Sequence, residues 1–180
     1  MNPSWHLRTA RLVMRPVAGV DLPDLQAIKA DPRVFAIMLG GVRTPARAAD
    51  ELAEDIAFWA ARGCGMWSVR EAGGGAFVGL TGFMQRPDGR GVALRFAFWP
   101  DARGHGLARE AAGAALRFGH EHAGLERIVA VARESNFASR TVLGGIGMVE
   151  AGSFVQGGHA MVLYESVSRP LLGGVTELAP

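Results

Sequence analysis

Cysteine and lysine are nearly absent from the sequence. Cys64 is the only cysteine among 180 residues, which excludes an internal disulfide and leaves no cysteine cluster to bind zinc. Lys29 is the only lysine, so almost all of the 19 basic residues are arginines. No apolar run approaches the roughly 20 residues that a membrane helix needs, and residues 1–16 lack the apolar segment of a secretory signal. These absences predict a cytoplasmic protein without a membrane-embedded segment.

The overall charge is small but unevenly distributed. The 19 bases against 17 acids give a net charge of +2, which argues against a general nucleic-acid binder. With 49% hydrophobic and 20% charged residues, the composition is that of a globular protein. Residues 90–140, however, contain eight arginines against five acids, a net of +3. The cationic excess is therefore local, and it marks this part of the chain as a candidate for binding an anion.

Apolar residues at helical spacing predict four helices. They are expected over residues 22–31, 45–62, 106–122 and 136–146. Asp21 is a candidate N-cap of the first helix, and Thr44, followed by Pro45, is a candidate N-cap of the second. Gly63 is expected to end the second helix. The apolar face of that helix is expected to contain Leu52, Ile56 and Trp59.

Alternating or continuous apolar runs predict seven strands. They are expected over residues 11–15, 66–70, 77–84, 91–99, 128–132, 148–155 and 159–165. Glycine-rich turns at 73–75 and 87–91 indicate an antiparallel meander, whereas the strand–helix–strand unit from 92 to 131 requires a parallel crossover. We therefore predict an α+β fold, with a mixed, mostly antiparallel sheet and helices on both faces. Residues 1–168 are expected to form one domain, and 169–180 a flexible C-terminal tail.

The most informative loop joins the strand that ends at Trp99 to the helix that follows. Gly104 and Gly106 allow backbone conformations that other residues avoid, and the first turn of a helix offers free N–H groups to an anion such as pyrophosphate. Arg103 and Arg109 flank this turn. The loop has neither the Gly-Lys-Ser/Thr of a P-loop nor a complete G-x-G-x-x-G. A simple tight turn between strand and helix would use the same glycines, so both interpretations stay open on this motif alone.

The loop also carries a family signature. Arg103-x-x-Gly106-x-Ala108 resembles the R/Q-x-x-G-x-G/A motif of the GNAT N-acetyltransferase superfamily, at the strand-to-helix junction where that family has it. Further matches, in order, point to the ribosomal-protein N-terminal acetyltransferase (RimJ/RimL-like) branch. They are the segments 7–16, 31–34, 65–69, 77–79 and 136–148. Each match is short, but the ordered set covers residues 7 to 165.

The resemblance implies how acetyl-CoA would bind. The sheet would splay between the strands 92–99 and 128–132. The pantetheine arm would lie in that opening and pair with the backbone around Phe96 to Trp99. The pyrophosphate would rest on the amides of the loop, with Asn136 near the pantetheine. The residues expected to bind the cofactor are Phe96, Phe98, Trp99, Arg103, Gly104, His105, Gly106, Leu107, Ala108, Arg109 and Asn136. The reaction implied is direct transfer of the acetyl group to a primary amine within a ternary complex.

The residue that protonates the departing thiolate differs from the common family pattern. Many members have a tyrosine in the helix after the second splayed strand, but this chain has Leu143 there, and its only tyrosine, Tyr164, lies in the last strand. In the RimJ/RimL-like branch a serine at the position of Ser139 is the proposed acid. A serine near a helix start also commonly bonds the backbone. Ser139 is therefore the candidate acid, with this structural alternative.

No general base can be assigned from the sequence. The branch often has a glutamate early in the strand before the signature, where this chain has Ala93. Glu134, His105 or water alone could accept the proton from the amine. Trp67 and Phe83 are candidates to line the acceptor cleft, although strand aromatics usually serve packing. His120 and His122 are two residues apart, on different faces of a helix, so no metal site is expected.

Two functional classes follow from these features. The first is an acetyl-CoA-dependent N-acetyltransferase that acts on a protein N-terminus or a small amine, with no metal, nucleic-acid or membrane partner; the branch also suggests a homodimer. The second is a non-catalytic acyl-CoA-binding or sensory domain, which the missing tyrosine and glutamate would suit. Release of CoA thiol in the presence of an amine separates the two.

Overall fold

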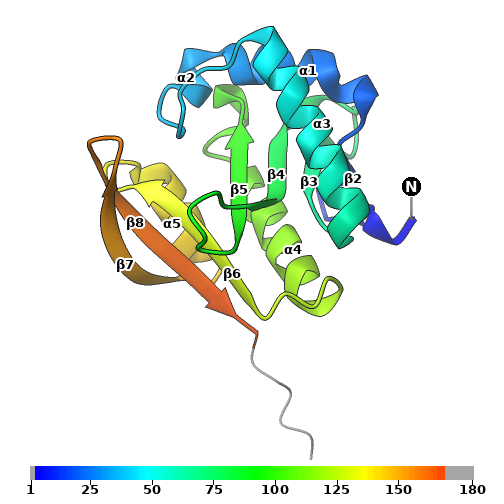
Figure 1. Cartoon of the computed structure of the whole chain (residues 1–180). Helices are drawn as coiled ribbons and strands as arrows, with labels where there is room; N and C mark the ends of the chain where they lie inside the picture. Colours follow the sequence, from blue (N-terminus) through cyan, green and yellow to red (C-terminus); the bar gives the residue numbers. More distant parts are fainter. Residues whose placement is uncertain (1–2, 169–180) are drawn as a thin grey trace, which may run out of the picture.

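Eight strands form one sheet in the computed structural model, which describes residues 3–168 (Figure 1). The strand order is β1-β2-β3-β4-β5-β6-β8-β7. The strands are β1 (Leu7–Arg8), β2 (Leu12–Pro16), β3 (Met66–Glu71), β4 (Phe77–Gln85), β5 (Val92–Phe98), β6 (Arg127–Arg133), β7 (Val149–Gln156) and β8 (His159–Val167). The helices are α1 (Leu22–Ala30), α2 (Pro32–Phe35), α3 (Pro45–Arg62), α4 (Leu107–Glu121) and α5 (Phe137–Gly145). Neighbouring strands are antiparallel except β5 and β6, so the α+β prediction is confirmed.

The predicted elements are present within one or two residues at most ends, and two short ones were not predicted. β1 has two residues, too few to show an alternating pattern. α2 begins at Pro32 because the Asp31 carboxylate accepts the N–H of Arg33, so the residue before the proline ends one helix and caps the next. The predicted tail, 169–180, lies outside the described residues.

The helix ends show which capping predictions were right. The hydroxyl of Thr44 accepts the N–H of Arg47 at 3.2 Å, and Gly63 ends α3 with φ of +65°. The prediction for Asp21 was wrong. Its carboxylate accepts the N–H of Ala18 and the guanidinium of Arg15 instead of an α1 amide. The backbone of Asp21 is helical, because this residue is the last of a 3₁₀ turn. An N-cap residue normally has an extended backbone, from which its side chain can reach the first amides of the helix.

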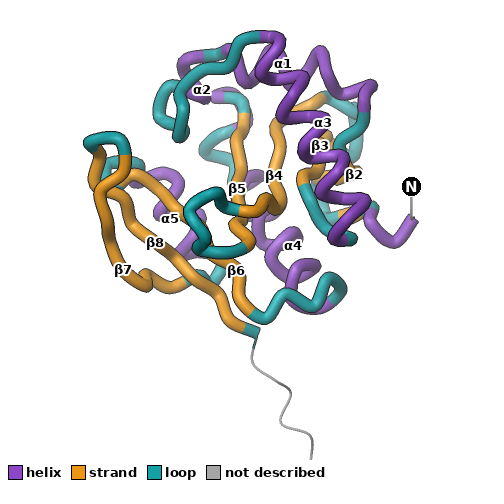
Figure 2. Tube along the Cα trace, viewed as in Figure 1, coloured by secondary structure: helices purple, strands orange, loops and turns teal. Residues whose placement is uncertain are grey.

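Helices cover the two faces of the sheet, here called the α3 face and the α4 face (Figure 2). On the α3 face, Arg95 of β5 pairs with Asp55 of α3 at 2.9 Å. On the α4 face, Gly119 of α4 lies so close to Phe83 and Ile128 that a Cβ would come within 2.6 Å and 2.7 Å of their side chains. Glycine at this point lets α4 pack directly on β4 and β6.

A cluster of aromatic rings fills the core beneath α4. The rings of Trp67 and Phe118 meet edge to face at 5.2 Å, and Phe83 lies 5.9 Å from Trp67. Trp67 and Phe83 are fully buried, so they pack the core and do not line an acceptor cleft as predicted. Trp59 joins this cluster from α3, whereas Ile56 is 40% exposed, contrary to the predicted apolar face of that helix.

The central strands β5 and β6 diverge, as the resemblance implied. They share a single aligned pair, Ala93 and Val129, near their amino ends. By contrast, seven pairs join β4 to β5 and seven join β6 to β8. The sheet therefore opens toward the carboxyl ends of β5 and β6 (Figure 1); we call this opening the fork. Across residues 3–168, no helix combines the length and the apolar character required to traverse a bilayer.

Candidate active site

The first turn of α4 lies at the open end of the fork and carries uncapped N–H groups. Gly104 and Gly106 have φ of +80° and +75°, which only glycine adopts without strain. α2, α3 and α5 each have a side chain that accepts an amide of their first turn, but no side chain within residues 3–168 does so for α4. The amides of Leu107 and Ala108 are thus available to an external acceptor, and the helix dipole favours an anion there.

An ion pair fixes the loop in front of α4. Arg11 pairs with Glu110 at 2.6 Å and donates to the His105 carbonyl at 2.8 Å, while Thr9 donates to the same glutamate. Burial opposes ionisation of Glu110, but the hydrogen bonds from Thr9 and Arg11 outweigh it and hold the pKa of Glu110 below its usual value. The one acid in the first turn is thereby neutralised by Arg11, so it does not repel an anion at the α4 terminus.

The two flanking arginines are placed differently. Arg103 donates to the carbonyls of Arg33 and Phe98 at 3.1 Å and 3.4 Å, so its side chain points back to α2 and the end of β5. Arg109 has no ion pair within the described part of the chain, and its guanidinium lies against Gly145 at the end of α5. Arg109 is therefore the free cation next to the α4 terminus, and Arg103 chiefly holds the loop in place.

The inner edge of β5 offers unpaired backbone groups to the fork. Trp99 donates its N–H to Val78 of β4 at 3.0 Å, and backbone groups alternate between the two edges of a strand. The backbone groups of Phe96 and Phe98 therefore face the fork, where β6 has already diverged. Of the predicted backbone contacts, both groups of Phe96 and the N–H of Phe98 are available. The Phe98 carbonyl already accepts from Arg103, and the N–H of Trp99 is bound to Val78.

α5 begins where β6 ends, at the other side of the fork. The Asn136 side-chain oxygen accepts the N–H of Ser139 at 3.1 Å and so caps α5. The Ser139 hydroxyl is half-buried and makes no hydrogen bond within residues 3–168. Tyr164 lies elsewhere, donating to Glu150 at 2.7 Å and accepting from Arg140. Ser139 therefore has a free hydroxyl in the first turn of α5, close to the end of β6.

The cap on α5 yields a first prediction. Replacing Asn136 with alanine should lower the free energy of unfolding by about 1 kcal/mol, the usual cost of losing an N-cap. Asn136→Asp keeps the accepting oxygen and should retain most of the stability. Urea unfolding of both variants measures the difference. Equal losses in the two variants would show that the cap is not what Asn136 contributes.

No carboxylate on the inner edge of β5 or β6 replaces the missing glutamate. Ala93 is buried beside Val129, and Glu134 is exposed with no side-chain partner in residues 3–168. His105 is also exposed, in the loop before α4. Neither Glu134 nor His105 is brought into the fork by a hydrogen bond, so the base stays unassigned.

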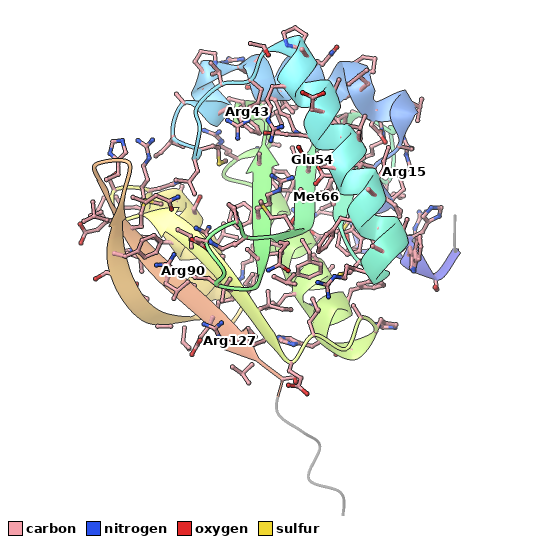
Figure 3. All side chains as sticks on the ribbon, viewed as in Figure 1. Arg15, Arg43, Glu54, Met66, Arg90 and Arg127 are labelled. Carbon is pink, nitrogen blue, oxygen red and sulfur yellow. The ribbon has the colours of Figure 1, made fainter. Side chains whose placement is uncertain are left out.

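A buried group of charges on the α3 face was not predicted from the sequence. Lys29 of α1, only 1% exposed, donates to Glu51 of α3 at 2.7 Å, and Arg43 binds the second oxygen of that glutamate at 2.6 Å. Burial lowers the pKa of Lys29 against the effect of Glu51, and burial raises the pKa of Asp55 despite Arg95. Figure 3 shows Arg43 in the loop that precedes α3. The sequence signal that could have revealed this group is the pair of acids Glu51 and Asp55, which are four residues apart on the buried side of α3.

A groove of about 880 Å³ runs along the outer side of α4, away from the fork. Its walls come from the β1–β2 turn, α4 and the end of α5, and it begins at Gly106 and Arg109. Arg8, Arg109 and Arg117 line it without an ion-pair partner within residues 3–168. The groove therefore extends the cationic surface that starts at the α4 terminus.

The described residues contain no group of three or more histidine, cysteine or acidic side chains that could hold a metal. His120 is engaged in structure, because its ring nitrogens contact the Leu125 carbonyl at 2.6 Å and the Ser166 hydroxyl at 2.9 Å. Cys64 is buried, which raises the pKa of its thiol to about 11. Neither side chain is free for chemistry.

Comparison with known proteins gives one family and one fold. The model of the acetyltransferase (GNAT) domain matches residues 11–149. The acetyltransferase from Agrobacterium tumefaciens is 25% identical with a TM-score of 0.80, covering 91% of this chain and 94% of its own. The Salmonella typhimurium acetyl transferase that modifies the N-terminal serine of ribosomal protein L7/L12 is 15% identical, with a TM-score of 0.75 and coverage of 89% and 97%. An L7/L12 alpha-N-protein acetyltransferase in complex with coenzyme A has 16% identity, a TM-score of 0.72 and coverage of 88% and 95%. At 15% and 16% identity, the similarity to these two proteins shows a common fold, the fold of the RimJ/RimL-like branch.

Proposed function

Since the chain belongs to the GNAT acetyltransferase family, we propose that residues 1–168 act as one domain that transfers an acetyl group from acetyl-CoA to a primary amine. One observation carries the proposal. The uncapped first turn of α4, preceded by Gly104 and Gly106 at positive φ, lies at the open end of the fork. The first turn of α4 suits the phosphates of a ligand. The open edge of β5 suits a long arm of the same ligand whose amides need backbone partners.

The residues present fit coenzyme A. The amides of Leu107 and Ala108 would bind the pyrophosphate, and Arg109 would add a charge-assisted bond. The backbone of Phe96 and the N–H of Phe98 would pair with the amides of the pantetheine arm. Asn136 would act mainly by capping α5, which keeps Ser139 at the fork.

The chemistry requires positioning and two proton movements. Acetyl-CoA supplies an activated thioester, whose carbonyl carbon is attacked by the amine nitrogen as the bond to sulfur breaks. The fork holds the thioester close to the amine, which removes most of the entropic cost of the encounter. The Ser139 hydroxyl would donate a proton to the departing sulfur and regain one from water. Water would also accept the proton that the amine loses.

The acceptor is a primary amine, either a protein N-terminus or a small molecule. A fold neighbour that modifies the N-terminal serine of a ribosomal protein supports the first class. The RimJ/RimL-like motifs in order along the chain support the same class. Peptides with a free and a blocked N-terminus, tested beside small amines, separate the two.

The role of Ser139 is tested by its replacement with alanine. Loss of a proton donor to the leaving sulfur should lower kcat by about 100-fold, with little change in the KM for acetyl-CoA. The matched control is Ser135→Ala, an exposed serine just before α5, which should keep full turnover. Thiol release under saturating acetyl-CoA measures both variants.

Two other outcomes have distinct meanings. Full turnover by Ser139→Ala would exclude the serine as the acid and leave the transferase proposal standing. Absence of thiol release from the unaltered protein with every amine, despite CoA binding, would instead identify a non-catalytic acyl-CoA-binding domain.

A further inference from the structure

Arg133 is the last residue of β6 and lies at the open end of the fork, on the α3 face. Its face follows from the register of the sheet. Ala93 shares a face with Arg95, whose side chain reaches Asp55 of α3, and Ala93 is aligned with Val129. Alternation along β6 then places Val131 and Arg133 on this same face, opposite α4. Arg133 therefore borders the fork on the side away from the α4 terminus.

The Arg133 side chain has no partner among the described residues. Its Nε is buried and makes no hydrogen bond, and its guanidinium forms no ion pair within residues 3–168. A buried donor left unbonded costs about 1–3 kcal/mol, and native proteins keep few of them. Such a group is expected where a ligand supplies the missing acceptor.

The acids on this face already have cationic partners. Asp55 pairs with Arg95, and Glu165 with Arg127, both at 2.9 Å. Glu134 follows Arg133 directly but is exposed and forms no ion pair with it.

Two further acids lie in the loops at the ends of β5, Asp88 before it and Asp101 after it, and neither forms an ion pair with Arg133. Asp88, in the turn between β4 and β5, pairs with Arg86 and Arg90. Figure 3 shows Arg90 and Arg127 at the closed end of the fork, the end opposite Arg133. The open end thus has a cation on the α3 face that no acid within residues 3–168 balances.

We propose that Arg133 binds a carboxylate carried by the acceptor, so that the preferred acceptors are amines with a nearby acidic group. The inference rests on the proposed function, because it takes the α4 face as the side for CoA and the α3 face as the side for the amine. A guanidinium binds a carboxylate with two parallel hydrogen bonds, which fixes the orientation of the acceptor as well as its charge. Arg133 is a specificity-determining residue in this account.

The carboxylate can come from an amino acid or from an acidic side chain of a peptide. Two matched pairs of acceptors distinguish these sources: glycine against glycinamide, and a peptide beginning Ser-Glu against one beginning Ser-Gln. In the pair that the unaltered protein acetylates, the acceptor with the carboxylate should have a KM at least 10-fold lower than the acceptor with the amide. A difference of this size is expected for a charged hydrogen bond.

Replacing Arg133 tests the assignment. Arg133→Met should raise the KM for the acid at least 10-fold and leave the KM for the amide unchanged, whereas Arg133→Lys should restore part of the preference. The matched control is Arg62→Met, an exposed arginine at the end of α3 that forms no ion pair within residues 3–168, and it should change neither KM. Because no protein group pairs with Arg133, the melting temperature of Arg133→Met should not fall.

Equilibrium binding separates this proposal from the proposed function. Calorimetric titration of the same acids and amides into CoA-saturated protein measures recognition without turnover. A preference for the acid that Arg133→Met removes supports the role of Arg133, even if no thiol is released. Equal affinities for acid and amide, or a preference that survives in Arg133→Met, would overturn it.

Discussion

Gly106→Val is expected to reduce the affinity for CoA about 100-fold, which is the loss of roughly 3 kcal/mol from two hydrogen bonds to a charged group. Gly106 has φ of +75°, a conformation that a β-branched residue adopts only with strain. The loop must shift to relieve the strain, and the shift moves the first amides of α4 away from the phosphate. Calorimetric titration of CoA measures the effect.

Gly89→Val is the matched control for this experiment. Gly89 has φ of +77° and open space around the position of a Cβ, but it lies in the turn between β4 and β5. The same substitution therefore introduces the same backbone strain at the amino end of β5, whereas the first turn of α4 follows its carboxyl end. CoA affinity should be unchanged in Gly89→Val. Similar losses of affinity in both variants would mean that strain weakens the whole fold and that Gly106 has no particular role in binding.

Glu51→Gln is expected to lower the free energy of unfolding by about 3–5 kcal/mol, the range for breaking a buried ion pair. Lys29 would keep a buried positive charge without its partner, and Arg43 would lose the oxygen it binds. Burial opposes ionisation of Glu51, but Lys29 and Arg43 hold its pKa below the ordinary 4.5. The stability that this carboxylate contributes is therefore present above pH 4.5 and is lost as the pH falls through the lowered pKa.

The control for the buried network is Glu54→Gln on the same helix. Glu54 pairs with Arg47, but its side chain is 62% exposed, so its loss should change the stability by less than about 1 kcal/mol. Urea unfolding of both variants at neutral and acid pH measures the difference, which should shrink at acid pH. Equal effects of the two substitutions would show that burial does not control the strength of the Lys29–Glu51 pair.

The sequence predicted most of the fold because its local signals agree with the tertiary structure. Alternation identified β3, β4 and β5, and the Thr44 cap and Gly63 end fixed α3. Asp21 was misassigned because the turn before α1 determines where its carboxylate points. Trp67 and Phe83 were placed at a cleft because alternation shows which residues share a face and does not show which helix covers that face.

The loop on the proposed cofactor side has a local sequence signal, whereas the proposed acceptor side has none. Gly104 and Gly106 leave a local signal, since positive φ and an uncapped helix start depend on a few adjacent residues. Arg133 leaves no such signal. Whether an arginine lacks a partner depends on residues distant in the sequence, such as Glu165, which pairs with Arg127 instead. The Lys29–Glu51 pair could not be predicted for the same reason, because its two residues lie on different helices, 22 positions apart in the sequence.

The proposed acetyl transfer depends on the binding of coenzyme A at the fork and the α4 terminus. Parallel calorimetric titrations of CoA and of pantetheine, which lacks the pyrophosphate, into the unaltered protein test it most directly. We expect one CoA site per chain and at least 10-fold weaker binding of pantetheine, because the amides of the α4 terminus and Arg109 would then have no phosphate to bind. Absence of CoA binding, or equal affinity for the two ligands, would contradict it.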